Sequence, residues 1–219
     1  MMNKAKYKRW PFIVGTLCLL AAAVITLSNH HEDRVAGEQA KEILDSIHEV
    51  TPITETAFSS AQSLLEKNSD EQIVPDYILN PDMEMPSIEI DGNLYIGTIS
   101  FPTLDLELPV MNSWSYPKLK KAPCLYFGSI YKGNAVIAAH NYDSHFGRLP
   151  ELKVGDTICF TDTDGNVFNY EVIIQEVLAP SAIDEMVGSD ADLTLFACTV
   201  GGASRFTVRC KVIESQGYL

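Results

Sequence analysis

Residues 192–198 read DLTLFAC and residues 205–213 read RFTVRCKVI, and these two stretches carry the fold prediction. Both are short and rich in aliphatic, aromatic and β-branched residues, which is typical of β-strands. The loop between them, residues 199–204, consists mainly of small, turn-prone residues. The two strands are therefore expected to pair as a hairpin, with Cys198 and Arg205 opposite each other at a Cβ separation of about 4.5–5.5 Å.

Side chains alternate between the two faces of a strand, so the pattern assigns each residue of this hairpin to a face. In the second strand, Cys210 belongs to the apolar face and Arg205 to the polar face. In the first strand, Cys198 and Ala197 point to opposite faces. We therefore expect the thiol of Cys210 in the core and the thiol of Cys198 outside it.

Further strand-like stretches occur at short spacing from residue 88 onward, with little helix between them. The expected strands cover residues 88–90, 94–99, 134–139, 156–161, 167–177, 193–197 and 206–213, and residues 101–110 are expected to supply a turn and another strand. The dipeptide Asp164-Gly165 between two of them is a strong hairpin signal. Residues 116–127 are expected to form a short helix and a loop. Seven or eight such strands predict a mostly β domain, built as a closed or nearly closed β-barrel.

A histidine ends one of the expected strands. The apolar run 134–139 leads directly into His140, and polar residues follow, so the imidazole is expected where the strand enters a loop. A thiol beside a positive charge and an imidazole suggests covalent catalysis at a carbonyl, with His140 as general acid or base. From spacing alone, each residue more often has a non-catalytic role: Cys198 as an inert core thiol, His140 as a structural or solvated residue and Arg205 as a surface charge. His145 is a weaker candidate than His140 because it lies in the middle of the loop.

The N-terminal residues predict a membrane anchor. Four basic side chains within residues 4–9 precede an uncharged run, residues 10–28. Its apolar part is at the short end for a membrane span, and the basic flank places the N-terminus in the cytoplasm. A cleaved signal peptide is the alternative, but the run is longer than a usual signal core and no clear cleavage site follows it. We therefore expect a cytoplasmic segment at 1–10 and an uncleaved transmembrane anchor at 11–28.

The residues after the anchor predict a stalk and then a domain. Residues 30–50 have apolar positions scattered among charges, as in a surface helix, and residues 53–68 are expected to form a second helix. The following stretch to residue 87 contains several prolines and is expected to be a loop. Residues 29–87 are thus interpreted as an extracellular helical stalk or linker, and residues 88–219 as the catalytic domain.

Charge and cysteine content restrict the partners. The chain has a net charge of −13, and the part after residue 29 holds 12 basic against 29 acidic residues, a net −17. Nucleic acid binding needs a basic surface, so it is excluded as a function.

The five cysteines show neither CxxC spacing nor a zinc pattern, so no metal or cofactor is expected. We expect Cys124, Cys159 and Cys210 to be core residues. Calcium use is left open, because the acidic loop residues equally suit a solvated surface: Asp143, Asp184, Glu185, Asp190 and Asp192.

Several of these stretches, taken in order, resemble the sortase family. Residues 193–198 followed by Arg205 resemble the family's signature around its nucleophile, and residues 135–140 resemble the strand that ends in the sortase histidine. The matching stretches also include residues 96–102, 108–110 and 146–156, so the resemblance covers about residues 88–215. One departure is Ala197, where the family often has threonine; it leaves the substrate preference open. The subclass is uncertain and not clearly of the pilus type, since no convincing aromatic lid precedes the domain.

The resemblance implies a closed eight-stranded β-barrel with short helices, tethered to the cell membrane with the domain outside. It implies a cysteine transpeptidase of Gram-positive type, which cleaves an LPXTG-like sorting signal of secreted proteins through a thioacyl-enzyme. An amine, from a peptidoglycan precursor or another acceptor of the cell wall, then takes up the acyl group. Carried over residue by residue, Cys198 is the nucleophile, His140 the general acid and base, and Arg205 the group that binds the carbonyl oxygen. The alternatives are a thiol peptidase that hydrolyses the same signal and a non-catalytic module that binds wall proteins.

Overall fold

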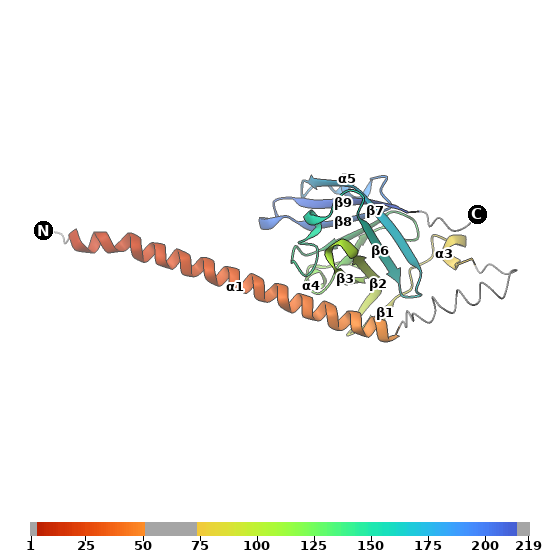
Figure 1. Ribbon diagram of the computed structural model, residues 1–219, viewed down its shortest axis with the longest axis horizontal. Helices are drawn as coiled ribbons and strands as arrows, with labels where there is room; N and C mark the ends of the chain where they lie inside the picture. The colour runs from red at the N-terminus through yellow and green to blue at the C-terminus, as the bar shows by residue number, and fades with distance from the viewer. Residues whose placement is uncertain (1–3, 51–73, 214–219) are drawn as a thin grey trace. The chain divides into compact units, whose positions relative to one another are not determined.

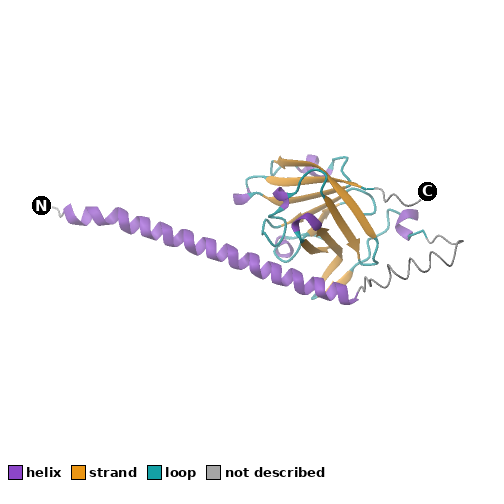
Figure 2. Cartoon of the chain, in the orientation of Figure 1, coloured by secondary structure: helices purple, strands orange, loops and turns teal. Residues whose placement is uncertain are grey.

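The computed structural model describes residues 4–50 and 74–213, and the chain divides into two compact units, Met1–Val35 and Ala36–Leu219. A long helix, α1 (Lys4–Val50), begins in the first unit and ends in the second. The structure of the second unit is otherwise a β-barrel with short helices, as Figures 1 and 2 show. The predicted helix over residues 53–68 lies outside the described residues.

In the first unit, the apolar part of α1 from Trp10 to Leu27 has exposed side chains. Trp10, Phe12 and Leu19 are among its large exposed hydrophobic residues, and Thr16 donates its hydroxyl hydrogen to the Phe12 carbonyl at 2.9 Å. Such back-bonding satisfies a hydroxyl group that would otherwise face an apolar environment. Among the described residues this is the one helix that is long enough and apolar enough to cross a membrane. It agrees with the predicted N-terminal apolar helix.

The end of α1 packs against the barrel within the second unit. Ala36, Ala40, Ile43 and Ile47 recur at helical spacing and are buried, so they form one apolar stripe. Ile43 and Ile47 join a hydrophobic cluster whose barrel residues include Tyr95, Met111 and Cys124. These helical turns fall within the predicted stalk, and its boundaries at residues 29 and 87 stay predictions.

Eight strands close the barrel, and a ninth extends one of them as a hairpin. In chain order they are β1 (Ile88–Ile90), β2 (Asn93–Phe101), β3 (Leu106–Met111), β4 (Cys124–Phe127), β5 (Ala135–Ala139), β6 (Thr157–Asp162), β7 (Val167–Leu178), β8 (Leu193–Cys198) and β9 (Arg205–Val212). Their order in the described sheet is β1-β2-β3-β4-β5-β8-β9-β7-β6, and a β2–β6 pairing closes the ring. The pairs β3–β4 and β5–β8 are parallel and the others antiparallel. The predicted closed eight-stranded barrel is confirmed.

Alternation along the strands fills the barrel interior. The enclosed side chains are large and apolar, and they include Ile99, Phe101, Leu108, Ile137, Phe160, Val172, Leu195 and Val208. Burial of each such side chain stabilises the fold by about 1.5–3 kcal/mol before the entropy of folding is counted. The short helical elements lie in the connections: α3 (Asp76–Leu79), η1 (Pro102–Leu104), α4 (Tyr116–Leu119), η2 (Leu149–Glu151), α5 (Ile183–Val187) and η3 (Val200–Gly202). The barrel is therefore a rigid frame for loops at its ends.

The Asp164-Gly165 hairpin is confirmed between β6 and β7. Gly165 adopts φ +86°, a left-handed conformation that other residues rarely take. The Asp162 carboxylate accepts hydrogen bonds from the backbone amides of Asp164 and Asn166 at 2.9 and 2.8 Å, and these bonds fix the turn.

The prediction for residues 116–127 was only half right. A short helix, α4, is present, but the expected loop after it contains strand β4. This strand has four residues, pairs with β3 at a single position and has an irregular register with β5. A stretch so short shows no clear alternation in the sequence, so its partners in the barrel determine its conformation.

Candidate active site

The barrel topology brings three strand ends together at one edge. Strand β5 pairs in parallel with β8, and its last residue, Ala139, is opposite Ala197. The next residue on each strand is therefore His140 on one side and Cys198 on the other. Strand β9 runs antiparallel to β8 with Arg205 opposite Cys198, which confirms the expected hairpin register. Sequence spacing could not show that His140 joins the other two, because its neighbour is a parallel strand more than fifty residues away in the chain.

Cys198 and Cys210 occupy the faces that alternation predicts. Ala197 is a core residue, and Cys198, the next residue, is half-buried on the outer face of β8. Cys124 and Cys210 are buried, and burial raises the pKa of each thiol to about 12. Cys159 was expected in the core but is half-buried, and its pKa is also raised by burial. All five cysteines of the chain are free thiols.

These differences in exposure predict selective alkylation. At about pH 8, a thiol-specific reagent should modify Cys198 well before Cys124 and Cys210, because the two buried thiols are inaccessible and remain protonated. Peptide mapping by mass spectrometry at successive times measures the order, and the denatured chain is the control in which the three rates converge. Faster modification of Cys210 than of Cys198 would contradict the assignment of strand faces.

The His140 ring is held by its own loop. Its Nδ1 lies 3.3 Å from Oδ1 of Asn141, and its ring stacks on Tyr142 with centroids 4.3 Å apart and planes 4° from parallel. A proton on Nδ1 would be donated to Asn141, which leaves Nε2 for proton exchange. His145 is fully buried, with its ring 5.6 Å from Tyr142, and is less suited to contact a substrate.

Arg205 is anchored in the loop between β8 and β9. Its Nη1 donates to the carbonyl oxygens of Gly202 at 3.3 Å and Ser204 at 3.0 Å. The loop itself is closed by Thr199, whose amide donates to the Ser204 carbonyl at 3.0 Å. Both anchoring bonds of Arg205 use a single nitrogen, and a guanidinium has five N–H donors. The side chain can therefore keep its position and still donate to another group.

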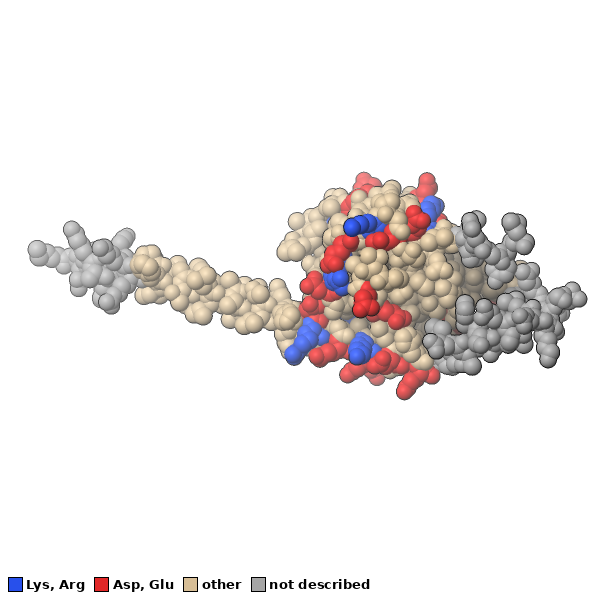
Figure 3. Space-filling view, in the orientation of Figure 1, with Lys and Arg blue, Asp and Glu red and all other residues tan. Residues whose placement is uncertain are grey.

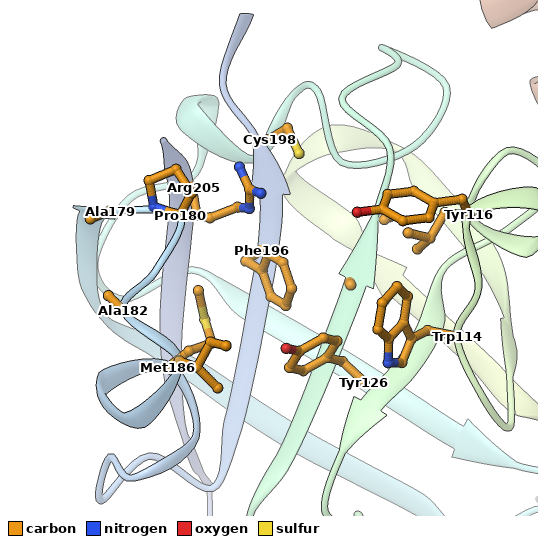
Figure 4. Close-up of a pocket in the computed structure, with 14 residues that line it drawn as sticks. Trp114, Tyr116, Tyr126, Ala179, Pro180, Ala182, Met186, Phe196, Cys198 and Arg205 are labelled. Atoms are coloured by element: carbon orange, nitrogen blue, oxygen red, sulfur yellow. The ribbon is translucent and has the colours of Figure 1, made fainter. Parts of the chain in front are cut away.

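An apolar groove leads away from the Cys198 thiol. It has a volume of about 220 Å³, and Figure 4 shows Cys198 and Arg205 at one end of it. Its other lining residues are Trp114, Tyr116, Leu119, Tyr126, Ala138, Ala139, Ala179, Pro180, Ala182, Ile183, Met186 and Phe196. Strands β4, β5 and β8 contribute the floor, the β7–β8 connection forms one wall, and the β3–β4 connection forms the other. His140 is not among the lining residues, so it lies beside this groove at the strand ends.

A row of aromatic rings forms much of the groove. Trp114 contacts Tyr116 with ring centroids 5.8 Å apart, Trp114 contacts Tyr126 at 5.4 Å, and Tyr126 contacts Phe196 at 5.3 Å. Edge-to-face and tilted contacts of this kind fix ring positions. The sequence prediction missed these residues. The only signal was the density of aromatic residues between 114 and 126, a stretch that overlaps the helix and loop expected at 116–127.

The surface of the described barrel is acidic (Figure 3). Figure 3 shows Asp and Glu side chains spread over the face of the barrel that it draws, with fewer Lys and Arg among them. Within residues 4–50 and 74–213, no group of three or more His, Cys, Asp or Glu side chains could hold a metal ion. One of the acidic residues considered for calcium, Asp192, accepts hydrogen bonds from Lys211 Nζ at 3.1 Å and from the Val212 amide at 2.8 Å. The expectation that no cofactor is used stays a prediction.

Comparison with known proteins identifies the family. The sequence model of the sortase domain matches residues 99–213, just over half of the chain. The chain belongs to the sortase family. Sortase A of Bacillus anthracis is 30% identical over 141 residues, which are 61% of this chain and 66% of that protein. The match thus spans just under two thirds of the relative's length.

Solved sortases have the same fold. A sortase D5 transpeptidase from Clostridium perfringens superimposes with a TM-score of 0.54 at 20% identity, over 80% of this chain and 99% of that chain. Sortase C of Streptococcus pneumoniae also gives a TM-score of 0.54, at 21% identity, over 81% of this chain and 100% of that chain. At these identities the likeness concerns the fold alone. These relatives belong to different sortase classes.

The two arginines of β9 in this sortase differ in their positions relative to the groove. Arg205 lies at the groove beside the thiol, whereas Arg209 is buried and donates to Glu176 at 2.8 Å. Of the two, only Arg205 lines the groove together with Cys198. Arg205 is also the arginine that the hairpin pattern in the sequence places opposite Cys198.

Proposed function

We propose that this sortase is a membrane-anchored cysteine transpeptidase that cleaves an LPXTG-like sorting signal of secreted proteins and transfers them to an amine acceptor of the cell wall. The observation that carries the proposal is the strand register: Cys198 is opposite Arg205, and His140 follows the neighbouring strand end, beside an apolar groove. Family membership supports the general activity. Catalytic roles for these three residues are part of the proposal.

In the first half-reaction, the Cys198 thiolate attacks the carbonyl carbon between threonine and glycine of the signal. Negative charge develops on the carbonyl oxygen, and Arg205 N–H groups donate to it. His140 gives its proton to the glycine nitrogen as the carbon–nitrogen bond breaks. The products are a thioacyl-enzyme and a peptide that begins with glycine.

In the second half-reaction, an amine attacks the same carbonyl carbon. His140 accepts a proton from the attacking nitrogen, and the sulfur of Cys198 leaves as thiolate. The new amide bond joins the secreted protein to the acceptor. The free energy of the cleaved amide bond is retained in the thioester, which then reacts to form the new amide bond.

The shape of the groove supports a peptide substrate with apolar side chains. Ala182, Ile183 and Met186 on one wall face Trp114 and Tyr116 on the other, so an extended peptide of apolar residues would bury its surface between them. A solved sortase C from Clostridium perfringens, with a TM-score of 0.53 and 22% identity, contains the C-terminal cell wall sorting motif. Ala197 points into the core and not into this groove, so we propose that the missing threonine hydroxyl leaves the chemistry of Cys198 intact.

The N-terminal helix supports the proposed location. Its exposed apolar side chains and basic flank are those expected of a single-pass anchor with a cytoplasmic N-terminus. We propose a cytoplasmic segment at 1–10, an anchor at 11–28, a stalk at 29–87 and an extracellular catalytic domain at 88–219. Proteins with a C-terminal sorting signal and a peptidoglycan precursor or other amine would be its partners.

The test incubates the full chain in detergent micelles with LPXTG-type peptides, with and without an amine acceptor. Mass spectrometry follows both the thioacyl adduct on Cys198 and the released products. Product that depends on the amine is expected. If the peptide is hydrolysed to the same extent with and without the amine, the thiol peptidase is favoured. If no peptide of a broad panel forms an adduct, the non-catalytic binding module is favoured.

A further inference from the structure

Arg209 is a buried cation that the proposed chemistry does not use. It lies four residues after Arg205 on the same face of β9, about 13 Å further along the strand, and its side chain is only 5% exposed. A buried charge is destabilising unless it is paired and fully hydrogen-bonded. The environment of Arg209 meets this condition.

The guanidinium of Arg209 has hydrogen-bond partners on every nitrogen. Nε donates to Glu176 at 2.8 Å, and Nη2 donates to the Glu185 carbonyl at 2.7 Å. Nη1 lies 2.8 Å from the Met186 carbonyl oxygen, 3.0 Å from Ser189 Oγ and 3.1 Å from Thr194 Oγ1. These partners belong to β7, to the end of α5, to the loop after it and to β8. One side chain therefore ties the β7–β8 connection to two strands of the barrel.

The tied segment cannot hold its conformation alone. Helix α5 has five residues and no side-chain cap at its N-terminus. A helix this short is unstable in isolation, because nucleation costs more than a few hydrogen bonds return. Its fixed position must come from tertiary contacts. Besides Arg209, the structure provides the buried Met186 side chain, whose sulfur lies 3.9 Å from Thr207 Oγ1.

The same segment forms one wall of the groove. Ala179, Pro180, Ala182, Ile183 and Met186 all line it, and Figure 4 shows Met186 on the side of the groove opposite Trp114. Arg209 binds the backbone of this wall from behind, at the Glu185 and Met186 carbonyls. Any movement of the guanidinium would therefore displace the surface on which a peptide docks.

We propose that Arg209 is a positioning residue that holds residues 179–189 as a preformed wall for the sorting peptide. This inference rests on the proposed function and adds a residue that controls peptide affinity without touching the peptide. Because the wall is already ordered before the peptide binds, binding does not carry the entropic cost of ordering it, and the affinity is higher. If only a fraction of molecules has the wall in place, the apparent dissociation constant rises in inverse proportion to that fraction.

The test compares Arg209→Met and Arg209→Lys with the unmodified full chain. Arg209→Met should raise KM for an LPXTG-type peptide about tenfold and change kcat less than about threefold. Arg209→Lys should also raise KM, since an ammonium cannot reproduce the planar fork of donors. Lys211→Met is the matched control on the same strand; Lys211 makes a half-exposed ion pair with Asp192, so KM should not change. A fall in kcat at unchanged KM would overturn the inference.

Two further measurements keep the proposal testable if Arg209→Met does not fold. Thr194→Val and Ser189→Ala each remove one acceptor from the guanidinium and should raise KM about two- to threefold. Hydrogen exchange without peptide should be faster at residues 179–189 in the Arg209 and Thr194 variants, with unchanged exchange in β5. Unchanged exchange at 179–189 would refute the positioning role. If the unmodified chain does not turn over any peptide, the proposed function fails, and the exchange result still decides the role of Arg209.

Discussion

Replacement of Cys198 by alanine should abolish formation of the thioacyl-enzyme and reduce turnover by about 10⁴-fold or more. Cys124 and Cys210 cannot take over the reaction, because both are fully buried and burial raises the pKa of each thiol to about 12. Steady-state cleavage of an LPXTG-type peptide and mass spectrometry of the protein measure the two effects. The fold should be retained, because Cys198 is half-buried at a strand end and its truncation leaves no enclosed cavity.

Cys210→Ala is the matched control for this prediction. Cys210 is a core residue on the neighbouring strand, so its truncation should lower the free energy of unfolding by about 1–2 kcal/mol and leave the turnover of folded molecules unchanged. Thermal unfolding followed by circular dichroism separates the two quantities. Residual acylation in Cys198→Ala would move the nucleophile to another residue and would refute the proposed mechanism.

Replacement of Arg205 by alanine is the second large effect expected. It should lower kcat by about 10²–10³-fold, the usual loss when one donor to a developing oxyanion is removed. The side chain borders the groove beside Cys198 and has donors to spare beyond its bonds to Gly202 and Ser204. Rapid-mixing measurements of the acylation step isolate the effect, because the charge on the carbonyl oxygen appears in that step.

Arg205→Lys distinguishes charge from geometry. A lysine keeps the positive charge but lacks the rigid fork, so partial recovery of the acylation rate is expected. The anchoring of Arg205 by two carbonyls suggests that position matters, and a full recovery would mean that charge alone is sufficient. An Arg205→Ala variant with normal acylation would remove this residue from the proposed site.

Much of the predicted fold and site rests on the alternation of side chains along single strands. The alternation in residues 193–198 and 205–213 assigned Ala197 and Cys210 to the core and Cys198 to the outer face, as the structure has them. The hairpin register followed from the short loop between the strands. These features depend on residues close together in the chain, where side-chain direction and turn composition are readable from the sequence.

The remaining features depend on contacts between distant residues. Strand β4 is too short to show a pattern, and the approach of His140 to Cys198 requires the parallel β5–β8 pairing across a long crossover. The aromatic side of the groove and the Arg209 network also join segments from different parts of the barrel.

By itself, the sequence determined the strands other than β4, the inner and outer faces of β8 and β9, the apolar N-terminal helix and the pairing of Cys198 with Arg205. Only the tertiary structure decided that His140 joins them, that an apolar groove leads to the thiol and that Arg209 supports one wall of that groove. The physical reason is that strand alternation is a property of neighbouring residues. Strand order and loop position are fixed by packing and hydrogen bonding between segments that the sequence separates.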